Sequence, residues 1–224
     1  NITIIGAGYV GLVSGICFAE FGFNITCVDK EGKKIQKLQD GEVPIYEPGL
    51  EVILKRNIDA NRITFTTELE SAVRSADIIF IAVGTPSRRG DGHADLSFVF
   101  NAAEEIAKSI NGYTLIVTKS TVPVGTGNKV KQIIKKENNK AEFDIASNPE
   151  FLREGSAIED FMRPDRVVVG VETEKAKKIM ATLYRPLYLL ETPIVYTSLE
   201  SAELIKYASN AFLAVKISYI NQMA

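Results

Sequence analysis

The chain has 224 residues, of which 46% are hydrophobic, and a formal net charge of −2. This length and apolar content suit one large globular domain, or one and a half, with a full hydrophobic core. The near-neutral charge argues against nucleic-acid or anionic-membrane binding and no apolar run is long enough to span a bilayer, so we expect a cytoplasmic protein with small-molecule partners.

The chain opens with a short apolar run, residues 2–5, which leads directly into the pattern Gly-x-Gly-x-x-Gly. This predicts a strand, a phosphate-binding turn and a helix over residues 12–21. Gly6 allows a tight turn, Gly8 leaves no Cβ between backbone and pyrophosphate, and Gly11 lets the helix lie close to the strand. The helix N-terminus then offers free N–H groups and a favourable dipole to an anion.

A second predicted strand, residues 25–28, ends at Asp29. An acidic residue about 20 positions past the glycines accepts a hydrogen bond from the ribose 2′-hydroxyl of NAD. Its charge repels the 2′-phosphate of NADP, so NAD is the preferred cofactor, although Lys30, Lys33 and Lys34 could offset that repulsion. The alternative is a tight βαβ corner with an exposed aspartate.

Strand-like and helix-like segments alternate along the rest of the chain, and residues 77–83 are apolar on both faces, as in a central parallel strand. The alternation predicts a Rossmann-like, doubly wound α/β domain over residues 1–197, with a parallel sheet of about eight strands. The further strands are expected at residues 63–66, 113–119, 143–147, 166–171 and 194–196. After Asp29, a lysine-rich helix is expected to end near residue 41. The further helices are expected to cover residues 49–56, 68–75, 96–110 (with Asp95 as N-cap), 126–138, 155–161 and 173–185.

The last segment, residues 198–224, has a helical pattern without Gly or Pro. Thr197 and Glu200 form a capping box at its start. Because the pattern runs to the last residue without a C-cap, we expect an N-terminal fragment in which a long central helix begins and a further part follows.

Ligands bind beyond the carboxyl ends of the strands in an open parallel sheet. Thr85 follows the fourth predicted strand, Thr121 and Thr126 follow the fifth, and Glu150 and Glu154 follow the sixth. Turn or N-cap roles would explain Thr85 or Thr126 equally well. The two glutamates suit a general base or a water-positioning pair, although a solvated helix start would also favour glutamate.

On the last helix, Lys206 and Asn210 share one face, with Glu203 one turn before Lys206. Such a stripe is either solvated or turned toward the ligand cleft. In the cleft, the lysine would stabilise an oxyanion and the asparagine amide would hold a substrate group.

The remaining reactive residue types are few. Cys17 and Cys27 lack metal-ligand spacing and are expected to be small core residues in a reducing compartment. His93 is the only histidine and lies in a polar loop, so we expect no metal site and no Ser-His-Asp arrangement.

Several of these motifs together resemble the UDP-glucose 6-dehydrogenase family, within the nucleotide-sugar dehydrogenases. The resemblance covers the whole chain in order. Its motifs are Gly6-Ala7-Gly8-Tyr9-Val10-Gly11, Glu47-Pro48-Gly49-Leu50, Val83-Gly84-Thr85-Pro86, Ser120-Thr121-Val122-Pro123-Val124-Gly125-Thr126, Asn148-Pro149-Glu150-Phe151-Leu152-Arg153-Glu154-Gly155 and residues 202–212.

The resemblance implies a four-electron oxidation of C6 of a UDP-sugar, from alcohol through aldehyde to carboxylate, with two NAD molecules as acceptors. It implies that NAD is bound by Gly6, Gly8, Tyr9, Val10, Gly11, Asp29, Lys34, Thr85, Thr121 and Glu154. It implies catalytic roles for Thr121, Glu150 (base for the water that hydrolyses a thioester), Lys206 (oxyanion stabilisation) and Asn210. The sugar nucleotide would contact Glu150, Phe151, Leu152, Arg153, Glu154, Lys206 and Asn210.

One family feature has no match in this chain, namely the nucleophilic cysteine of a Gly-Gly-x-Cys motif beyond the central helix. Cys17 and Cys27 lie in the wrong elements to replace it. We therefore expect this chain alone to bind NAD and part of the substrate without completing the oxidation. The helix is expected to lead to a homodimer interface and a UDP-binding part.

Alternative functions remain open from the sequence. GDP-mannose and UDP-N-acetylhexosamine 6-dehydrogenases share the architecture, while the threonine and paired-glutamate motifs argue against a hydroxyacid or 6-phosphogluconate type dehydrogenase. A non-catalytic module that senses NAD is the alternative from a different class.

Overall fold

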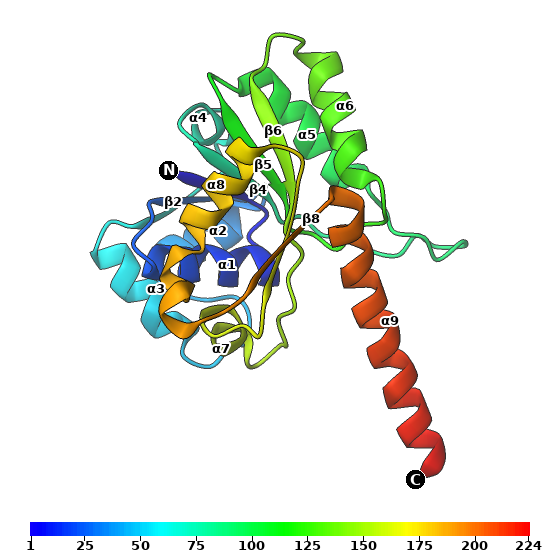
Figure 1. Cartoon of the computed structure of the whole chain (residues 1–224). Coiled ribbons are helices and arrows are strands. Elements are labelled where there is room, and N and C mark those ends of the chain that lie inside the picture. Colours follow the sequence, from blue (N-terminus) through cyan, green and yellow to red (C-terminus); the bar gives the residue numbers. More distant parts are fainter.

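The computed structural model describes the backbone of residues 1–224 and all side chains except those of residues 189 and 190. In this description the chain forms an eight-stranded sheet in the order β3-β2-β1-β4-β5-β6-β7-β8, with helices on both faces and a long final helix (Figure 1). The predicted Rossmann-like α/β architecture, with about eight strands and a terminal helix, is confirmed. The strands are β1 (Ile2–Ile5), β2 (Ile25–Val28), β3 (Ile63–Thr66), β4 (Ile78–Ile81), β5 (Thr114–Thr118), β6 (Phe143–Ser147), β7 (Val167–Val171) and β8 (Ile194–Thr197).

The helices follow the strands in alternation. They are α1 (Tyr9–Glu20), α2 (Gly32–Gln39), α3 (Leu50–Asp59), α4 (Leu69–Arg74), α5 (Ser97–Ser109), α6 (Thr126–Glu137), α7 (Ala157–Met162), α8 (Glu174–Leu183), the 3-10 helix η1 (Arg185–Leu190) and α9 (Leu199–Met223). The η1 turn is the one element here that the sequence pattern did not predict.

The core lies on both faces of the sheet because successive strand residues point to opposite sides. In β4, Ile78 and Phe80 join the core cluster that packs against α1, whereas Ile79 and Ile81 join the cluster that packs against α5. All four residues of β4 are buried. This explains why the strand is a continuous apolar run with no polar alternation.

The sheet is not wholly parallel, which corrects the sequence prediction. Strand β7 pairs antiparallel with β6, through Ala146 opposite Val171 and Ser147 opposite Gly170, while the other strand pairs are parallel. Between β6 and β7 the helix α7 has 6 residues. At 1.5 Å per residue it is too short to carry the chain back along the sheet, so β7 starts at the edge where β6 ends.

Most helices start within one or two residues of the predicted position, and the differences at α1, α5 and α9 concern the glycine-rich turn and the N-caps. Helix α1 begins at Tyr9, immediately after the glycine-rich turn. Helix α5 has Leu96 as its N-cap, not the predicted Asp95. Asp95 lies one residue before this N-cap, and its carboxylate accepts a hydrogen bond from the Ser97 N–H at 3.0 Å. The cap of α9 is Ser198, whose side chain accepts from the Ser201 N–H, so the cap lies one residue after the predicted Thr197.

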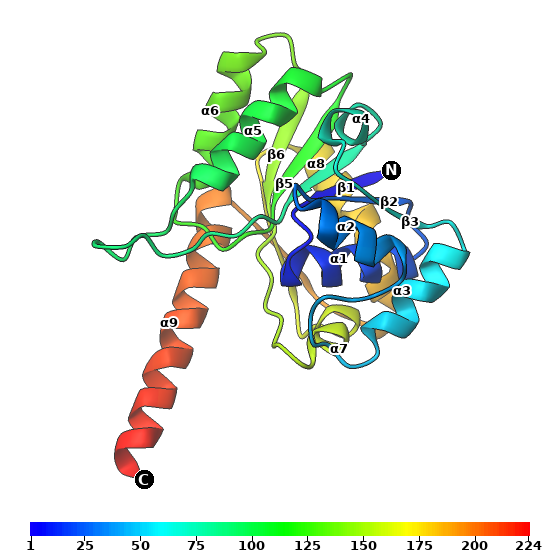
Figure 2. The same ribbon diagram turned by 180° about the vertical axis from the view of Figure 1, so that it is seen from behind.

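Helix α9 projects away from the domain after its first two turns, as both views show (Figures 1 and 2). Its buried residues are Leu199, Ala202, Glu203 and Lys206. The helix lies so close to β7 that a Cβ at Gly170 would be 2.6 Å from the Ser198 carbonyl oxygen. Among the described residues, α9 included, none of the helices combines the length and apolar character needed to cross a lipid bilayer.

Candidate functional site

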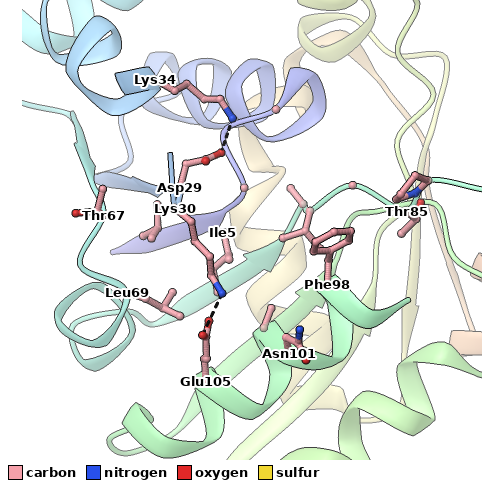
Figure 3. Close-up of a pocket in the computed structure, with 18 residues that line it drawn as sticks. Ile5, Asp29, Lys30, Lys34, Thr67, Leu69, Thr85, Phe98, Asn101 and Glu105 are labelled. Atoms are coloured by element: carbon pink, nitrogen blue, oxygen red, sulfur yellow. Dashed lines mark hydrogen bonds and ion pairs between the residues drawn. The ribbon is translucent and has the colours of Figure 1, made fainter. Parts of the chain in front are cut away.

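A cavity of about 980 Å³ opens beyond the carboxyl ends of β1, β2 and β4 (Figure 3). Its volume is at the upper end of the usual range for ligand pockets. The glycine-rich turn, Asp29 at the end of β2 and Thr85 after β4 border it, and residues of α5 such as Phe98 and Asn101 form another wall. The fold therefore places the predicted phosphate-binding turn and the predicted ribose-binding carboxylate at one cavity.

The three glycines of the turn have different structural reasons. Gly6 has a φ of +102°, and a Cβ there would be 2.7 Å from the Ala82 carbonyl oxygen. A Cβ at Gly11 would be 1.9 Å from the Gly6 carbonyl oxygen. Both positions therefore require glycine for the fold itself. By contrast, a Cβ at Gly8, which borders the cavity, would meet nothing within 4 Å, so a side chain there would project into open space.

Asp29 is held by three hydrogen bonds at the end of β2. Its Oδ2 accepts from the Ala7 N–H and from Lys34 Nζ, each at 2.9 Å, and its Oδ1 accepts from the Glu31 N–H at 3.0 Å. Partial burial acts to raise its pKa, but these donors outweigh it and hold the pKa of Asp29 below its ordinary value. The carboxylate is thus ionised and fixed in orientation at the cavity wall.

Lysines and threonines complete the rim of the cavity. Lys34 pairs with Asp29, while Lys30 reaches Glu105 on α5 at 3.1 Å in an exposed ion pair (Figure 3). On the other side, Thr85 donates its hydroxyl hydrogen bond to the Thr121 carbonyl oxygen at 2.9 Å. Thr85 and Thr121 therefore join the loops that follow β4 and β5.

A largely buried ion pair joins the loop after β6 to helix α9. Lys206 Nζ on α9 is 3.3 Å from Glu150 Oε1, and their side chains are only 8% and 13% exposed. The other Glu150 oxygen accepts from the Leu152 N–H at 2.5 Å, and the Lys206 ammonium lies 5.1 Å from the centre of the Phe151 ring. Residues from the loop after β6 and from α9, far apart in sequence, thus form one site that contains both a carboxylate and an ammonium group.

The stripe on α9 divides between the two alternatives that the sequence left open. Lys206 and Glu203 are buried against the domain, whereas Asn210 is exposed. Glu203 accepts from the N–H groups of Gly125 and Gly127 at 2.6 and 2.7 Å, so it caps the start of α6. Burial raises its pKa, and these two donors partly oppose that effect. Glu203 therefore anchors α9 one turn before Lys206.

The loop of residues 151–155 is partly committed to local contacts. Arg153 pairs with Asp160 at 2.6 Å, and the guanidinium lowers the pKa of that carboxyl. Leu152 packs against the core, and Glu154 is exposed. Thr126 donates to the Pro123 carbonyl oxygen at 2.6 Å, which is the turn role considered for it.

Glu47 is a buried residue to which the sequence pattern assigned no role. It accepts hydrogen bonds from the Tyr9 hydroxyl, from the Gly155 N–H at 2.9 Å and from the Ile158 N–H at 3.3 Å. Burial, with the hydrogen bond to Glu47, raises the pKa of Tyr9 to about 12. Glu47 thereby ties the glycine-rich turn to the loop after β6. In the sequence, the one indication of this role is that an acidic residue stands inside a proline-rich loop.

Lys119, directly after β5, was likewise missed. Its side chain is buried and its ammonium donates to Asn148 Oδ1 at 3.1 Å. Desolvation lowers the pKa of Lys119 to about 8. A lysine that follows five apolar or small strand residues was the only hint in the sequence.

Other reactive side chains lie away from these sites. Cys17 and Cys27 are buried free thiols, and burial raises the pKa of each to about 12, which suppresses the nucleophilic thiolate. Within the part of the chain whose side chains are described, no group of three or more His, Cys, Asp or Glu residues is arranged to hold a metal ion.

Comparison with known proteins gives the same family along the whole chain. UDP-glucose 6-dehydrogenase from Rhizobium meliloti is 58% identical over 226 residues, and UDP-glucose 6-dehydrogenase TuaD from Bacillus subtilis is 52% identical over 225. Both alignments include 100% of this chain, but only 52% and 48% of those proteins, so the chain spans about half the length of these relatives.

Solved structures agree with the sequence matches. A UDP-glucose dehydrogenase from Pyrobaculum islandicum has a TM-score of 0.94 at 41% identity, over 99% of this chain and 51% of that one. GDP-mannose dehydrogenase from Pseudomonas aeruginosa also has a TM-score of 0.94, at 36% identity, over 98% of this chain and 51% of that one. Residues 1–188 match the NAD binding domain, and residues 200–224 the central domain, of one family. The chain belongs to the UDP-glucose/GDP-mannose dehydrogenase family, as its motifs indicated.

Proposed function

We propose that the protein to which this chain belongs is an NAD-dependent UDP-glucose 6-dehydrogenase, which oxidises C6 of the sugar from alcohol to carboxylate. The observation that carries this proposal is the Glu150–Lys206 pair, whose glutamate follows β6 at the same carboxyl-end edge of the sheet onto which the large cavity opens. A base and a fixed cation at one site suit a reaction that both builds negative charge on oxygen and consumes water. The names of the relatives at 58% and 52% identity support UDP-glucose as the substrate.

The residues of the cavity fit NAD, the cofactor of the family domain that the chain matches. The open space at Gly8 is a cradle that any Cβ would fill, and the α1 N-terminus supplies N–H groups at Tyr9 and Val10. The ionised Asp29, fixed by Lys34, would accept from the adenosine ribose. Its negative charge disfavours the 2′-phosphate of NADP.

The nicotinamide end would lie near the loops after β4, β5 and β6. We assign Thr85 and Thr121 to nicotinamide binding. We place Glu154 beside the nicotinamide, because the Glu154 side chain is exposed and therefore accessible. Bound NAD supplies the hydride acceptor for each of the two oxidations. The chain's own residues have to orient the sugar carbon and control protons around it.

Lys206 is proposed to stabilise negative charge that develops on the C6 oxygen, because its buried ammonium keeps its strength where water is excluded. In the last step Glu150 takes a proton from water, the water oxygen bonds to the thioester carbon, and the carbon–sulfur bond breaks to release thiolate. From the resemblance to the family, we place the cysteine of that thioester in the part of the relatives' length that this chain does not span. Thr121 and Asn210 are proposed to orient the water and the sugar.

The substrate would lie along the loop from Phe151 to Glu154. Phe151 and Leu152 offer half-buried apolar surface, and the Arg153 guanidinium lies at the surface beside Asp160. A diphosphate would compete with Asp160 for this guanidinium, because carboxylate and phosphate groups both accept two parallel hydrogen bonds from arginine.

The exposed apolar face of α9 supports a homodimer formed through this helix. Phe212, Val215 and Ile220 are 66%, 63% and 62% exposed, and a large exposed apolar patch of this kind typically marks a protein–protein contact. We place the boundary of the NAD-binding domain at residue 197 and the start of the central helix at residue 198. A cytoplasmic location is supported by the two buried free thiols.

The function is tested by mixing the full-length protein with UDP-glucose and excess NAD and counting the NADH formed for each sugar consumed. Two NADH per sugar are expected, with the carboxylate as product. One NADH per sugar would indicate an ordinary alcohol dehydrogenase and contradict the proposal. Turnover of GDP-mannose or a UDP-N-acetylhexosamine in place of UDP-glucose would retain the chemistry but overturn the proposed substrate.

A further inference from the structure

Lys119 is a buried lysine that the proposed chemistry does not use. It follows β5, is 3% exposed, and its Nζ donates to Asn148 Oδ1 at 3.1 Å and to the Asn148 carbonyl oxygen at 3.4 Å. The rings of Phe80 and Phe161 lie 5.9 and 5.8 Å from the ammonium. Burial of an ammonium among aromatic rings is unfavourable unless polar partners compensate it. An apolar residue of the same length would avoid that penalty.

The acceptor of this lysine is held from several directions. Asn148 Nδ2 donates to the Val168 carbonyl oxygen at 2.8 Å, and the Tyr184 hydroxyl donates to Asn148 Oδ1 at 2.6 Å. The backbone N–H of Asn148 donates to the Thr118 carbonyl oxygen at 2.9 Å. Asn148 is thus a junction at which β5, β6, β7 and the end of α8 meet. Among the described side chains, Lys119 provides the charged contact of Asn148.

The position of Asn148 determines where Glu150 begins. The residue between them, Pro149, has a fixed φ, so the two-residue connection is stiff. Glu150 then forms its ion pair with Lys206 at 3.3 Å. Lys119 and Glu150 also border the same small cavity, of about 50 Å³, together with Asp160 and Arg166. A shift of Asn148 would therefore move the carboxylate relative to α9.

We propose that Lys119 is a positioning residue for Glu150: through Asn148 and Pro149 its ammonium fixes the carboxylate opposite Lys206. This inference rests on the proposed role of Glu150 as the base that activates water. Lys119 itself touches neither substrate nor cofactor in this assignment. Because burial lowers its pKa to about 8, the ammonium is mostly charged at neutral pH.

The test compares full-length Lys119→Met with wild type in rapid-mixing experiments with UDP-glucose and NAD. Hydrolysis is expected to slow about tenfold or more, because small displacements of catalytic groups cost this much or more in rate. Hydride transfer is expected to remain fast, so NADH appears as a burst of two per active site before a slow steady state. The KM for NAD is expected to stay within about twofold. A purely structural role would lower all steps together and give no burst.

Three further variants make the result decisive. Lys131→Met removes a lysine that pairs with Glu172 away from the site, and it should behave as wild type. Tyr184→Phe removes the Tyr184 hydroxyl, which also donates to Asn148 Oδ1, so it should slow hydrolysis less than Lys119→Met does and still give an NADH burst. If Lys119→Met does not fold, as judged by its NAD binding, Lys119→Gln and Tyr184→Phe carry the test. No burst in either of them would then overturn the inference.

Glu150→Gln separates this inference from the proposed function. If Glu150→Gln hydrolyses as fast as wild type, the role of Glu150 itself is wrong. If Glu150→Gln gives the burst and slow hydrolysis but Lys119→Met keeps the wild-type time course, only the role of Lys119 is wrong. Both variants with a burst, and Lys131→Met without one, would support the assignment.

Discussion

Substitution of Gly8 by alanine separates the cofactor cradle from the fold that holds it. Gly8 is the N-cap of α1, with φ of −79° and ψ of −170°, an extended conformation that any residue adopts. Its added Cβ would meet no atom within 4 Å. We therefore expect the free energy of unfolding of Gly8→Ala to lie within about 0.5 kcal/mol of wild type, or slightly above it because the unfolded chain loses freedom.

The same methyl group would stand where a pyrophosphate approaches the backbone. Loss of two hydrogen bonds from backbone N–H groups to the charged phosphates, at about 1.5 kcal/mol or more each, amounts to about 3 kcal/mol. This corresponds to a rise in the Kd for NAD of about 100-fold, since each 1.4 kcal/mol is tenfold. Isothermal titration calorimetry gives the Kd, and urea unfolding gives the stability of the same preparations.

Gly11→Ala is the matched control on the same turn. Its Cβ would lie 1.9 Å from the Gly6 carbonyl oxygen, which is backbone and cannot move aside. We expect a loss of stability of about 3 kcal/mol or more, because the clash forces the helix away from the strand. A Gly8→Ala variant that binds NAD within threefold of wild type would refute the assignment of this cavity to the pyrophosphate.

Three further predictions address charge, capping and assembly. Asp29→Asn should raise the Kd for NAD about tenfold or more. The folded pKa of Asp29 is lowered, so its contribution to stability should be present above its ordinary pKa of 3.8 and be lost as the pH falls below that value. The free energies of unfolding of variant and wild type in urea should therefore converge in acid but differ at neutral pH. Glu203→Gln should lower stability by about 1–3 kcal/mol in urea unfolding, since one of the two α6 N–H donors loses its acceptor, and equal stability would count against the cap. Phe212→Glu should shift the full-length protein toward monomer in analytical ultracentrifugation, and an unchanged dimer would exclude this face of α9.

The architecture was accessible from the sequence because its signals are local. Apolar strands, glycines at the turn and Asp29 after β2 each reflect the geometry of neighbouring residues, and β3 and β6 have the predicted bounds. The antiparallel β7 was not accessible in the same way. Its direction depends on the short length of α7, and a pattern of hydrophobic residues carries no information about strand direction.

The site residues likewise include some that the sequence pattern indicates and others that only the tertiary structure reveals. Glu150 and Lys206 attracted notice because charged residues in motifs at strand ends and on helix faces stand out in a sequence. Whether Lys206 or Asn210 would turn inward was undetermined, because that depends on how close α9 approaches β7 at Gly170. Glu47 is buried by contacts with residues more than 100 positions away, as its bond to Gly155 illustrates, and no local pattern announces such contacts.

The central claim is that the cavity beside Asp29 and the Glu150–Lys206 pair form one dehydrogenase site. The most direct measurement is a crystal structure of the full-length protein with NAD and UDP-glucose bound. The claim predicts the ribose on Asp29 and the C6 oxygen of the sugar within hydrogen-bond reach, about 2.6–3.2 Å, of Lys206 Nζ. A sugar bound elsewhere, with the Glu150–Lys206 pair undisturbed at its 3.3 Å separation, would contradict it.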